Sequence, residues 1–403
     1  MSDTNRQDDW QAAVLGELTG TRPAPGPGPA AAPDRALAPA PAAPGGPGGQ
    51  APGGPGLGPA RAEVPAYPAS GNPAGPVAGA PLPPGAPPGA GAAGAPESVP
   101  VRWGEGGGRE RHGEGVGRRV VRSLRGALGG SAARAVAVES GLAARVQQPV
   151  TTGRHIVVTS IRGGSGKTTV TALLSRTYNH LRHDPVLTLE ADAALGTLPV
   201  RLGVESLRWT CGDLARIVRP SMQLTDVTGY LVPLPDGGWL LPASLGRIGA
   251  QVDVAAYRTV MVALRRYFGV TVVDCETLPG EVARTALDTA HARVLTTPAT
   301  AEGLDSTHAV LDWLATLPVP VLPRTVVVLA VQSPHPAVDL ARAGERLAAT
   351  GAGVVVLPYD RHLAAGGPVR TALLGEGTRL AAVRLAAEAL QRAVALPAAG
   401  GAR

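Results

Sequence analysis

A single lysine stands in this chain of 403 residues, and the residues around it are of the types that bind phosphate. Residues 160–170 read SIRGGSGKTTV, with Lys167 in the middle. The chain has 37 lysines and arginines in total, so the other 36 are arginines. A bias towards GC-rich codons explains why lysine is scarce, but not where the one lysine lies. An ammonium group on a flexible stem reaches into a tight backbone cradle, whereas a guanidinium group is a broad planar fork. We infer that chemistry requires Lys167.

The glycines of this segment supply the cradle. Gly163, Gly164 and Gly166 let consecutive backbone N–H groups converge on phosphate oxygens, and a helix that begins there adds its dipole. In such a loop the lysine reaches the β- and γ-phosphates, and the hydroxyl of the next residue, Thr168, binds Mg²⁺. Guanine-specific proteins with this loop need a second lysine to recognise the base, and this chain has none. We therefore predict that the chain binds ATP and Mg²⁺. The predicted nucleotide-binding residues of the loop are Gly163, Gly164, Ser165, Gly166, Lys167, Thr168 and Thr169.

The elements around the loop are those that must position it. HIVVTS precedes it as a strand, and TTVTALLSRTYNHL follows it as a helix. Short apolar runs of this kind recur down the chain, most of them separated by helix-length segments, which predicts an α/β fold with a mainly parallel sheet and helices on both faces. YLVPLPDGGWLLPAS instead predicts a hairpin that turns at residues 236–238. The predicted strands are HIVVTS, PVLTLE, GVTVVDC, ARVLTT, RTVVVLAV and GVVVLP.

The loop RGGSGKT resembles the KGGxGKT loop of the ParA/MinD family of deviant P-loop ATPases, which have a SIMIBI-like fold. Arg162 stands where that family carries its signature lysine. In the family, this lysine crosses a nucleotide-sandwich dimer and contacts the phosphates of the other subunit. The resemblance covers residues 155 to about 395. It implies a slowly hydrolysing ATPase that forms an ATP-dependent homodimer, with Arg162 in the catalytic set.

The same resemblance assigns roles to residues at the ends of later strands. VLTLEADAALGTL is similar to the family's acidic switch, with Glu190 and Asp192 in the acidic positions and Ala193 in place of the usual proline. By position, Asp192 matches the carboxylate that positions or activates the attacking water. VTVVDCETLPG is similar to the second acidic strand end, in which Asp274 contacts Mg²⁺ through water, and its last residues, ETLPG, resemble the family's switch loop. Gln332 and Pro358 stand where the family contacts the base.

Composition divides the rest of the chain. Residues 21–100 hold 23 of the 40 prolines, with glycine and alanine filling most of the remainder, and such a segment cannot bury enough apolar surface to fold. We predict a short helical docking peptide over 1–20, a disordered linker over 21–116, a basic helical segment over 117–150, an ATPase domain over 151–396 and a disordered tail over 397–403.

The proline-rich arm joined to this ATPase is most similar to the actinobacterial ATPases associated with type VII (ESX) secretion. The resemblance implies a partner in a secretion or partitioning machinery, which the docking peptide would engage. Two alternatives stay open: a DNA-partitioning ATPase that binds DNA nonspecifically, since the net charge is +6, and a scaffold that binds nucleotide without hydrolysing it. The first residues lack the order of an export signal, and no apolar run is long enough to span a membrane. We expect a cytoplasmic protein, recruited to the membrane only by a partner.

Overall fold

The computed structural model describes residues 97–101, 112–113, 115, 131–194, 196–247, 249–277 and 280–395. All of them belong to one compact unit, Pro83–Arg403. The predicted docking peptide (1–20), most of the predicted linker and the predicted tail (397–403) lie outside the described residues.

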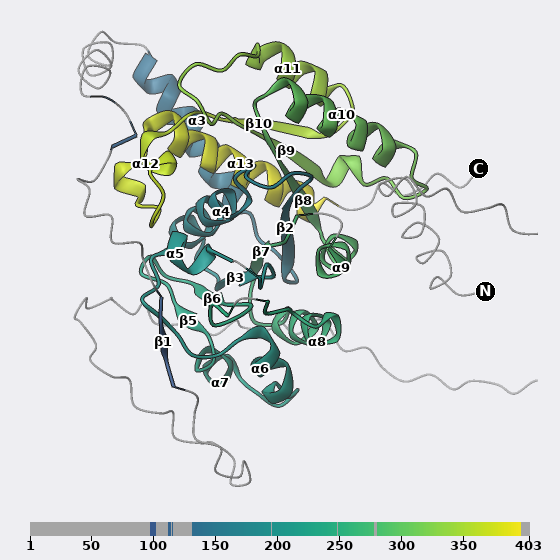
Figure 1. Cartoon of the computed structure of the whole chain (residues 1–403). Helices are drawn as coiled ribbons and strands as arrows, with labels where there is room; N and C mark the ends of the chain where they lie inside the picture. The colour runs from purple at the N-terminus through teal and green to yellow at the C-terminus, as the bar shows by residue number, and fades with distance from the viewer. Residues whose placement is uncertain are drawn as a thin grey trace, which may run out of the picture. The chain divides into compact units, whose positions relative to one another are not determined.

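An eight-stranded sheet forms the centre of this unit (Figure 1). Its strand order is β10-β9-β8-β2-β7-β3-β6-β5, and every neighbouring pair is parallel except β5 and β6. The inner strands are buried along nearly their whole length because helices cover both faces of the sheet. The strands are β2 (Arg154–Ser160), β3 (Val186–Glu190), β5 (Val232–Pro233), β6 (Trp239–Leu241), β7 (Val270–Asp274), β8 (Ala292–Pro298), β9 (Thr325–Ala330) and β10 (Gly353–Leu357).

One face of the sheet packs against α4 (Lys167–Leu181) and α13 (Glu376–Val394). Ile156 and Val158 of β2 point to this side. The C-terminal helix α13 is lined by buried alanines and leucines and contacts α3 (Ser131–Val146) and several strands, so it is a packing helix. The short helices α5 (Leu198–Leu202) and α12 (Arg361–Ala364) lie at the margin of this face.

On the opposite face of the sheet lie the side chains that alternate along the strands with those of the first face. Val157 and Val273 pack with α6 (Cys211–Ile217), α8 (Val254–Leu264) and α9 (Glu281–Thr289). Towards β10, the cover is α10 (Ala301–Ala315) and α11 (Leu340–Ala348). The remaining short elements are α7 (Leu224–Thr228), η1 (Leu322–Arg324) and η2 (Thr371–Leu373). Both cysteines are buried and free, and each is a small core residue on this side of the sheet.

The predicted fold class is confirmed, and so is the hairpin, which turns through Gly237 and Gly238 between β5 and β6. One helix end differs from its prediction. The apolar pattern predicts a helix over 255–268, but α8 ends at Leu264, because residues 265–269 turn the chain into β7.

Parts of the predicted linker contact this unit. Val99–Pro100 form β1, which pairs antiparallel with β4 (Ser206–Leu207). The backbone N–H of Gly113 donates to the carbonyl of Leu373 at 2.7 Å. In the predicted basic segment, α3 begins at Ser131 and lies along α13. Within the described residues, no helix is long and apolar enough to cross a bilayer.

Candidate functional site

The glycine loop joins the carboxyl end of β2 to the first residue of α4. Gly164 (φ 73°) and Gly166 (φ 91°) have left-handed backbones, which glycine adopts without steric cost. A Cβ placed on Gly163, Gly164 or Gly166 would meet no atom within 4 Å, so the space over the loop is open. No side chain caps α4, which leaves the N–H groups of its first turn to an outside acceptor. The loop is therefore a built anion cradle.

Hydrogen bonds beneath the loop hold this shape. Ser165 is 1% exposed, and its hydroxyl lies 2.9 Å from that of Thr296 on β8. The Ser160 hydroxyl donates to the carbonyl of Arg162 at 2.8 Å. Gln332, which follows β9, donates its side-chain amide to the carbonyl of Gly164 at 2.5 Å. Three strands thus fix the loop before any ligand binds.

Lys167 points from the start of α4 towards the segment that follows β7. Its ammonium group donates to the hydroxyl of Thr277 at 2.8 Å. Thr277 belongs to the segment ETLPG, which the sequence predicts to be a switch loop. Sequence reasoning did not single out Thr277; the only signal was its place three residues after Asp274. The cation of the cradle is therefore bonded to the switch segment.

Asp274 lies at the end of β7 and is fully buried. Its Oδ1 accepts a hydrogen bond from the Thr171 hydroxyl at 3.0 Å, and Thr168 also bonds to the carboxyl group. Burial raises the pKa of Asp274 to about 7, although these hydrogen bonds and the charge of Lys167 pull it down. Its Oδ2 is buried and has no hydrogen-bond partner among the described residues.

The residues around Asp274 fit Mg²⁺. A buried carboxylate oxygen without a partner, beside the Thr168 hydroxyl, offers the hard oxygen ligands that Mg²⁺ prefers. Within the described part of the chain, no group of three or more His, Cys, Asp or Glu residues could hold a metal alone. This agrees with the way Mg²⁺ binds in nucleotide sites, where one or two protein ligands act together with phosphate oxygens and water.

Glu190 is the last residue of β3, and Asp192 comes two residues later. Their carboxyl groups have different surroundings. Asp192 is half-buried, and its charge contributes to the raised pKa values of Asp274 and Glu276, so it faces the same space. Glu190 is 2% exposed and accepts hydrogen bonds from the backbone N–H groups of Leu198 (3.3 Å) and Ala243 (3.2 Å). Burial raises the pKa of Glu190 to about 8. Glu190 therefore anchors the loop that carries Asp192.

The other predicted residues lie at the rim of the cradle or away from it. Arg162 is exposed and donates to the Ser306 hydroxyl on α10 at 3.0 Å. Thr169 is half-buried in the first turn of α4. Pro358 follows β10 and lies beside Gly377 near the start of α13. The structure thus brings together Lys167, Thr168, Asp192 and Asp274, with Gln332 on the loop itself.

Comparison with known proteins adds a sequence relative. No family model matches the chain. Two curated proteins, both named ESX-1 secretion-associated protein EspI and both from strains of Mycobacterium tuberculosis, are 28% identical over 249 residues. The chain is similar to EspI. The match covers 59% of this chain but 36% of EspI, so the chain spans about a third of the length of the EspI proteins.

Solved structures with related folds accompany the EspI match. A ParA family ATPase from Chlorobium tepidum is 13% identical, covers 58% of this chain and 98% of its own, and has a TM-score of 0.48. The cell-division ATPase MinD from Pyrococcus furiosus is 24% identical, covers 59% of this chain and 99% of its own, and has a TM-score of 0.47. Because both TM-scores are below 0.5, the assignment of a P-loop fold rests on the chain's own strand order and on the geometry of its glycine loop.

Proposed function

We propose that this chain is an ATP-binding, slowly hydrolysing molecular switch of the ParA/MinD type. The observation that carries the proposal is the open glycine cradle with Lys167 at its mouth and the buried carboxyl of Asp274 behind it. Phosphoryl transfer needs little covalent help from a protein; it needs a positioned triphosphate and cations to stabilise the developing charge. The cradle, the ammonium group and the carboxyl together meet these needs.

Each residue then has a defined task. Backbone N–H groups from Gly163 onward bind the phosphates, and Lys167 turns from Thr277 to the β- and γ-phosphate oxygens. Thr168 and Asp274 hold Mg²⁺, which neutralises charge on those oxygens when bound. Asp192 positions the attacking water. Because Lys167 exchanges the Thr277 hydroxyl for phosphate, ATP binding releases the switch segment, and this exchange is the switching step.

The proposed setting is a secretion system. EspI is named as an ESX-1 secretion-associated protein, and its similarity to this chain supports a role beside a type VII secretion apparatus. We propose that ATP and Mg²⁺ favour a homodimer in the cytoplasm, and that residues 1–20 engage a partner which brings the protein to the membrane.

Calorimetry with a Lys167→Ala variant tests the nucleotide site. We expect ATP affinity to fall at least about 100-fold, because the variant loses a charge-assisted contact to phosphate in a partly buried site. Arg258→Ala is the matched control, since Arg258 is an exposed cation on α8, outside the site. Equal ATP affinity in wild type and Lys167→Ala would overturn the proposal.

A nucleotide-binding scaffold without hydrolysis is the second candidate. It is favoured by Arg162, whose side chain bonds to Ser306 of its own chain, and by Ala193 in the usual proline position. Phosphate release under saturating ATP separates the two functions. For the switch, Asp192→Ala should keep ATP binding and slow release about tenfold or more; for the scaffold, wild type and variant should both release no phosphate.

A further inference from the structure

A second group of basic side chains lies at the amino-terminal edge of the sheet, opposite the glycine loop. Arg154 and His155 begin β2, His291 directly precedes β8, Arg324 directly precedes β9, and Arg265 lies in the turn into β7. Because β9, β8, β2 and β7 are neighbours in the sheet, their starts meet at one edge. We call Arg154, His155, Arg265, His291 and Arg324 the amino-edge cluster.

Direct contacts join the two histidines of the cluster. The backbone N–H of His155 donates to Nδ1 of His291 at 3.0 Å, and the two rings meet edge to face with centroids 5.2 Å apart. Burial, together with the neighbouring cationic groups, lowers the pKa of His155 to about 3 and that of His291 to about 4. Both rings are therefore neutral near pH 7, and charge in the cluster comes from the arginines.

The arginines repel one another. Burial and the charges of Arg265 and Arg324 lower the pKa of Arg154. The Nη1 atom of Arg154 donates to the Thr152 hydroxyl at 3.1 Å, but its Nε is buried and has no partner among the described residues. Asp184, an acidic residue beside Arg265, is held by Arg182 through bonds of 2.7 and 2.9 Å. Positive charges therefore lie close together in the cluster, and their repulsion lowers the stability of the free protein. A bound anion would offset this repulsion.

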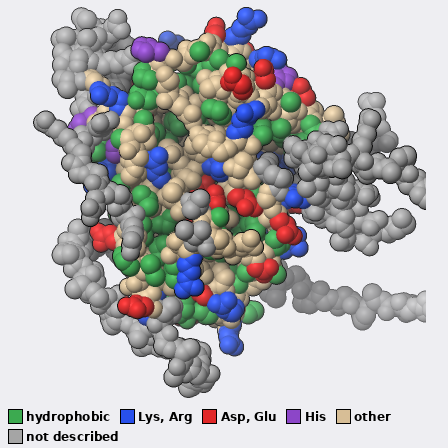
Figure 2. All heavy atoms as spheres, in the orientation of Figure 1, with side chains coloured by type: hydrophobic (Ala, Val, Ile, Leu, Met, Phe, Trp, Pro, Cys, Tyr) green, Lys and Arg blue, Asp and Glu red, His purple; other side chains and the backbone are tan. Residues whose placement is uncertain are grey.

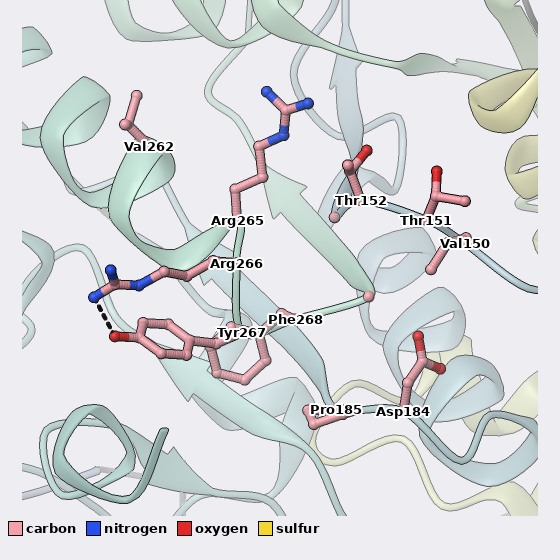
Figure 3. A pocket seen from close by; sticks show the side chains of 12 residues that line it. Val150, Thr151, Thr152, Asp184, Pro185, Val262, Arg265, Arg266, Tyr267 and Phe268 are labelled. Carbon is pink, nitrogen blue, oxygen red and sulfur yellow. Dashed lines mark hydrogen bonds between the residues drawn. The ribbon is translucent and has the colours of Figure 1, made fainter. Parts of the chain in front are cut away.

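An open groove of about 560 Å³ runs beside the cluster (Figure 3). Thr151, Thr152 and Arg265 are among the residues that line it. The Arg266 side chain turns to the Tyr267 hydroxyl and to carbonyls of residues 219–222, whereas Arg265 extends on the side of Thr152. Within the described part of the chain, the Arg265 guanidinium has no hydrogen-bond partner, so it is available to a ligand.

We propose that the amino-edge cluster and its groove bind a phosphate-bearing ligand at a site separate from the glycine loop. Of the cluster, Arg265 lines the groove, and its guanidinium group can donate paired hydrogen bonds to phosphate oxygens. The hydroxyls of Thr151 and Thr152 are further possible donors, and the charge of Arg154 lies nearby. Asp184 also lines the groove, but its carboxylate is bonded to Arg182. The groove volume lies within the range of small-molecule sites. On the face shown in Figure 2, acidic and basic side chains are interspersed.

Pyrophosphate binding to the full chain tests this site. The titration is done by calorimetry on a Lys167→Ala background, in which the glycine loop no longer competes for the probe. We expect measurable binding that weakens about tenfold or more when Arg265→Ala is added, since one charge-assisted phosphate contact is lost. Arg258→Ala is the matched control, because Arg258 is exposed on α8 but does not line the groove, and it should change affinity less than about twofold.

Two results would overturn the site: no pyrophosphate binding on the Lys167→Ala background, or equal weakening by Arg265→Ala and Arg258→Ala. Sedimentation with vesicles of phosphatidylglycerol in phosphatidylcholine then identifies the source of the phosphate group. Vesicle binding that Arg265→Ala abolishes assigns the site to a lipid headgroup, and pyrophosphate binding without vesicle binding assigns it to a free phosphate compound.

Discussion

The two ends of the same strands lie in contrasting electrostatic environments. At their carboxyl ends, β2 runs into the glycine loop and β7 ends at Asp274, so an ammonium group, a buried carboxyl and threonine hydroxyls face one another. At their amino ends, β2 starts with Arg154 and His155 and β7 is preceded by Arg265, so like charges meet. A parallel sheet aligns all its strand starts at one edge and all its strand ends at the other, which allows the two environments to form independently.

The contrast suggests two kinds of binding. At the carboxyl edge, opposite charges and hydrogen bonds hold the groups in place before a ligand arrives, which is the preorganisation that catalysis needs. At the amino edge, Arg154 and Arg265 have no ion-pair partner among the described residues, so they gain most when an anionic ligand arrives, which favours binding without chemistry. Substitutions at each edge test whether the two differ in this way.

Replacing Asp274 by Asn should have the largest effect. The variant keeps the shape of the side chain and its contact with the Thr171 hydroxyl but removes the negative charge. We expect Mg²⁺-dependent phosphate release to fall about 100-fold or more, whereas ATP binding in EDTA changes little, because the carboxylate acts through the metal. Phosphate-release assays and calorimetry measure the two quantities. Equal losses with and without Mg²⁺ would show that Asp274 serves only the fold.

The carboxyl edge was also the part that sequence predicted best. Residues 155–182 form one contiguous strand, loop and helix, and a short motif of this kind determines its own geometry. The role of Glu190 was not predicted: its partners, the backbone N–H groups of Leu198 and Ala243, come from later segments whose path no local pattern specifies.

Stability should depend on pH with opposite signs at the two edges. The raised pKa values of Asp274 (about 7) and Glu190 (about 8) mean that the folded chain binds more protons than the unfolded chain up to pH 8, so these groups lower the free energy of unfolding as pH rises. The lowered pKa values of His155 and His291 act the other way, but only below their ordinary value of about 6.5.

The two effects separate above pH 6.5. There we expect the free energy of unfolding in Mg²⁺-free buffer to fall by on the order of 1–2 kcal/mol up to pH 8, measured by denaturant titration. Glu190→Gln should reduce the slope of the curve between pH 7 and 8, because Glu190 is still mostly protonated there, whereas Asp274 is already more than half ionised above pH 7. A fall of unchanged size in that variant would contradict the assignment.

Thr277→Val should have a smaller effect, in the opposite direction from the other changes at this edge. The variant removes the hydroxyl that Lys167 must leave when ATP binds, while keeping the shape of the side chain. Because one hydrogen bond to a charged group no longer competes with phosphate, ATP affinity should rise about two- to tenfold in calorimetry. Thr259→Val serves as the control, because Thr259 is exposed on α8 and lies outside the site. Thr169→Val would not be a neutral control, because Thr169 lies in the first turn of α4, next to the glycine loop. Weaker ATP binding in Thr277→Val would mean that Thr277 helps to hold the nucleotide.

Sequence analysis missed the amino-edge cluster altogether. Arg154, Arg265 and Arg324 are more than fifty residues apart from one another in the chain, and arginine is too common in this sequence to mark a site by its type. Only the strand order, which places β9, β8, β2 and β7 side by side, brings them to one edge. Lys167 was found because its residue type is unique; these arginines could be found only from the fold.

The smallest predicted effect is on the stability of Arg265→Ala. Removing one of several mutually repelling charges should raise the free energy of unfolding by up to about 1 kcal/mol at low salt, and the gain should shrink at 0.5 M salt because exposed charges are screened. ATP affinity should stay within about twofold of wild type, since Arg265 lies at the opposite edge of the sheet from the glycine loop. Arg258→Ala removes another exposed charge, on α8 and outside the cluster, and its stability should stay within about 0.5 kcal/mol of wild type. If Arg265→Ala were less stable than Arg258→Ala at low salt, Arg265 would have a favourable partner in the free protein, and the contrast between the two edges would be lost.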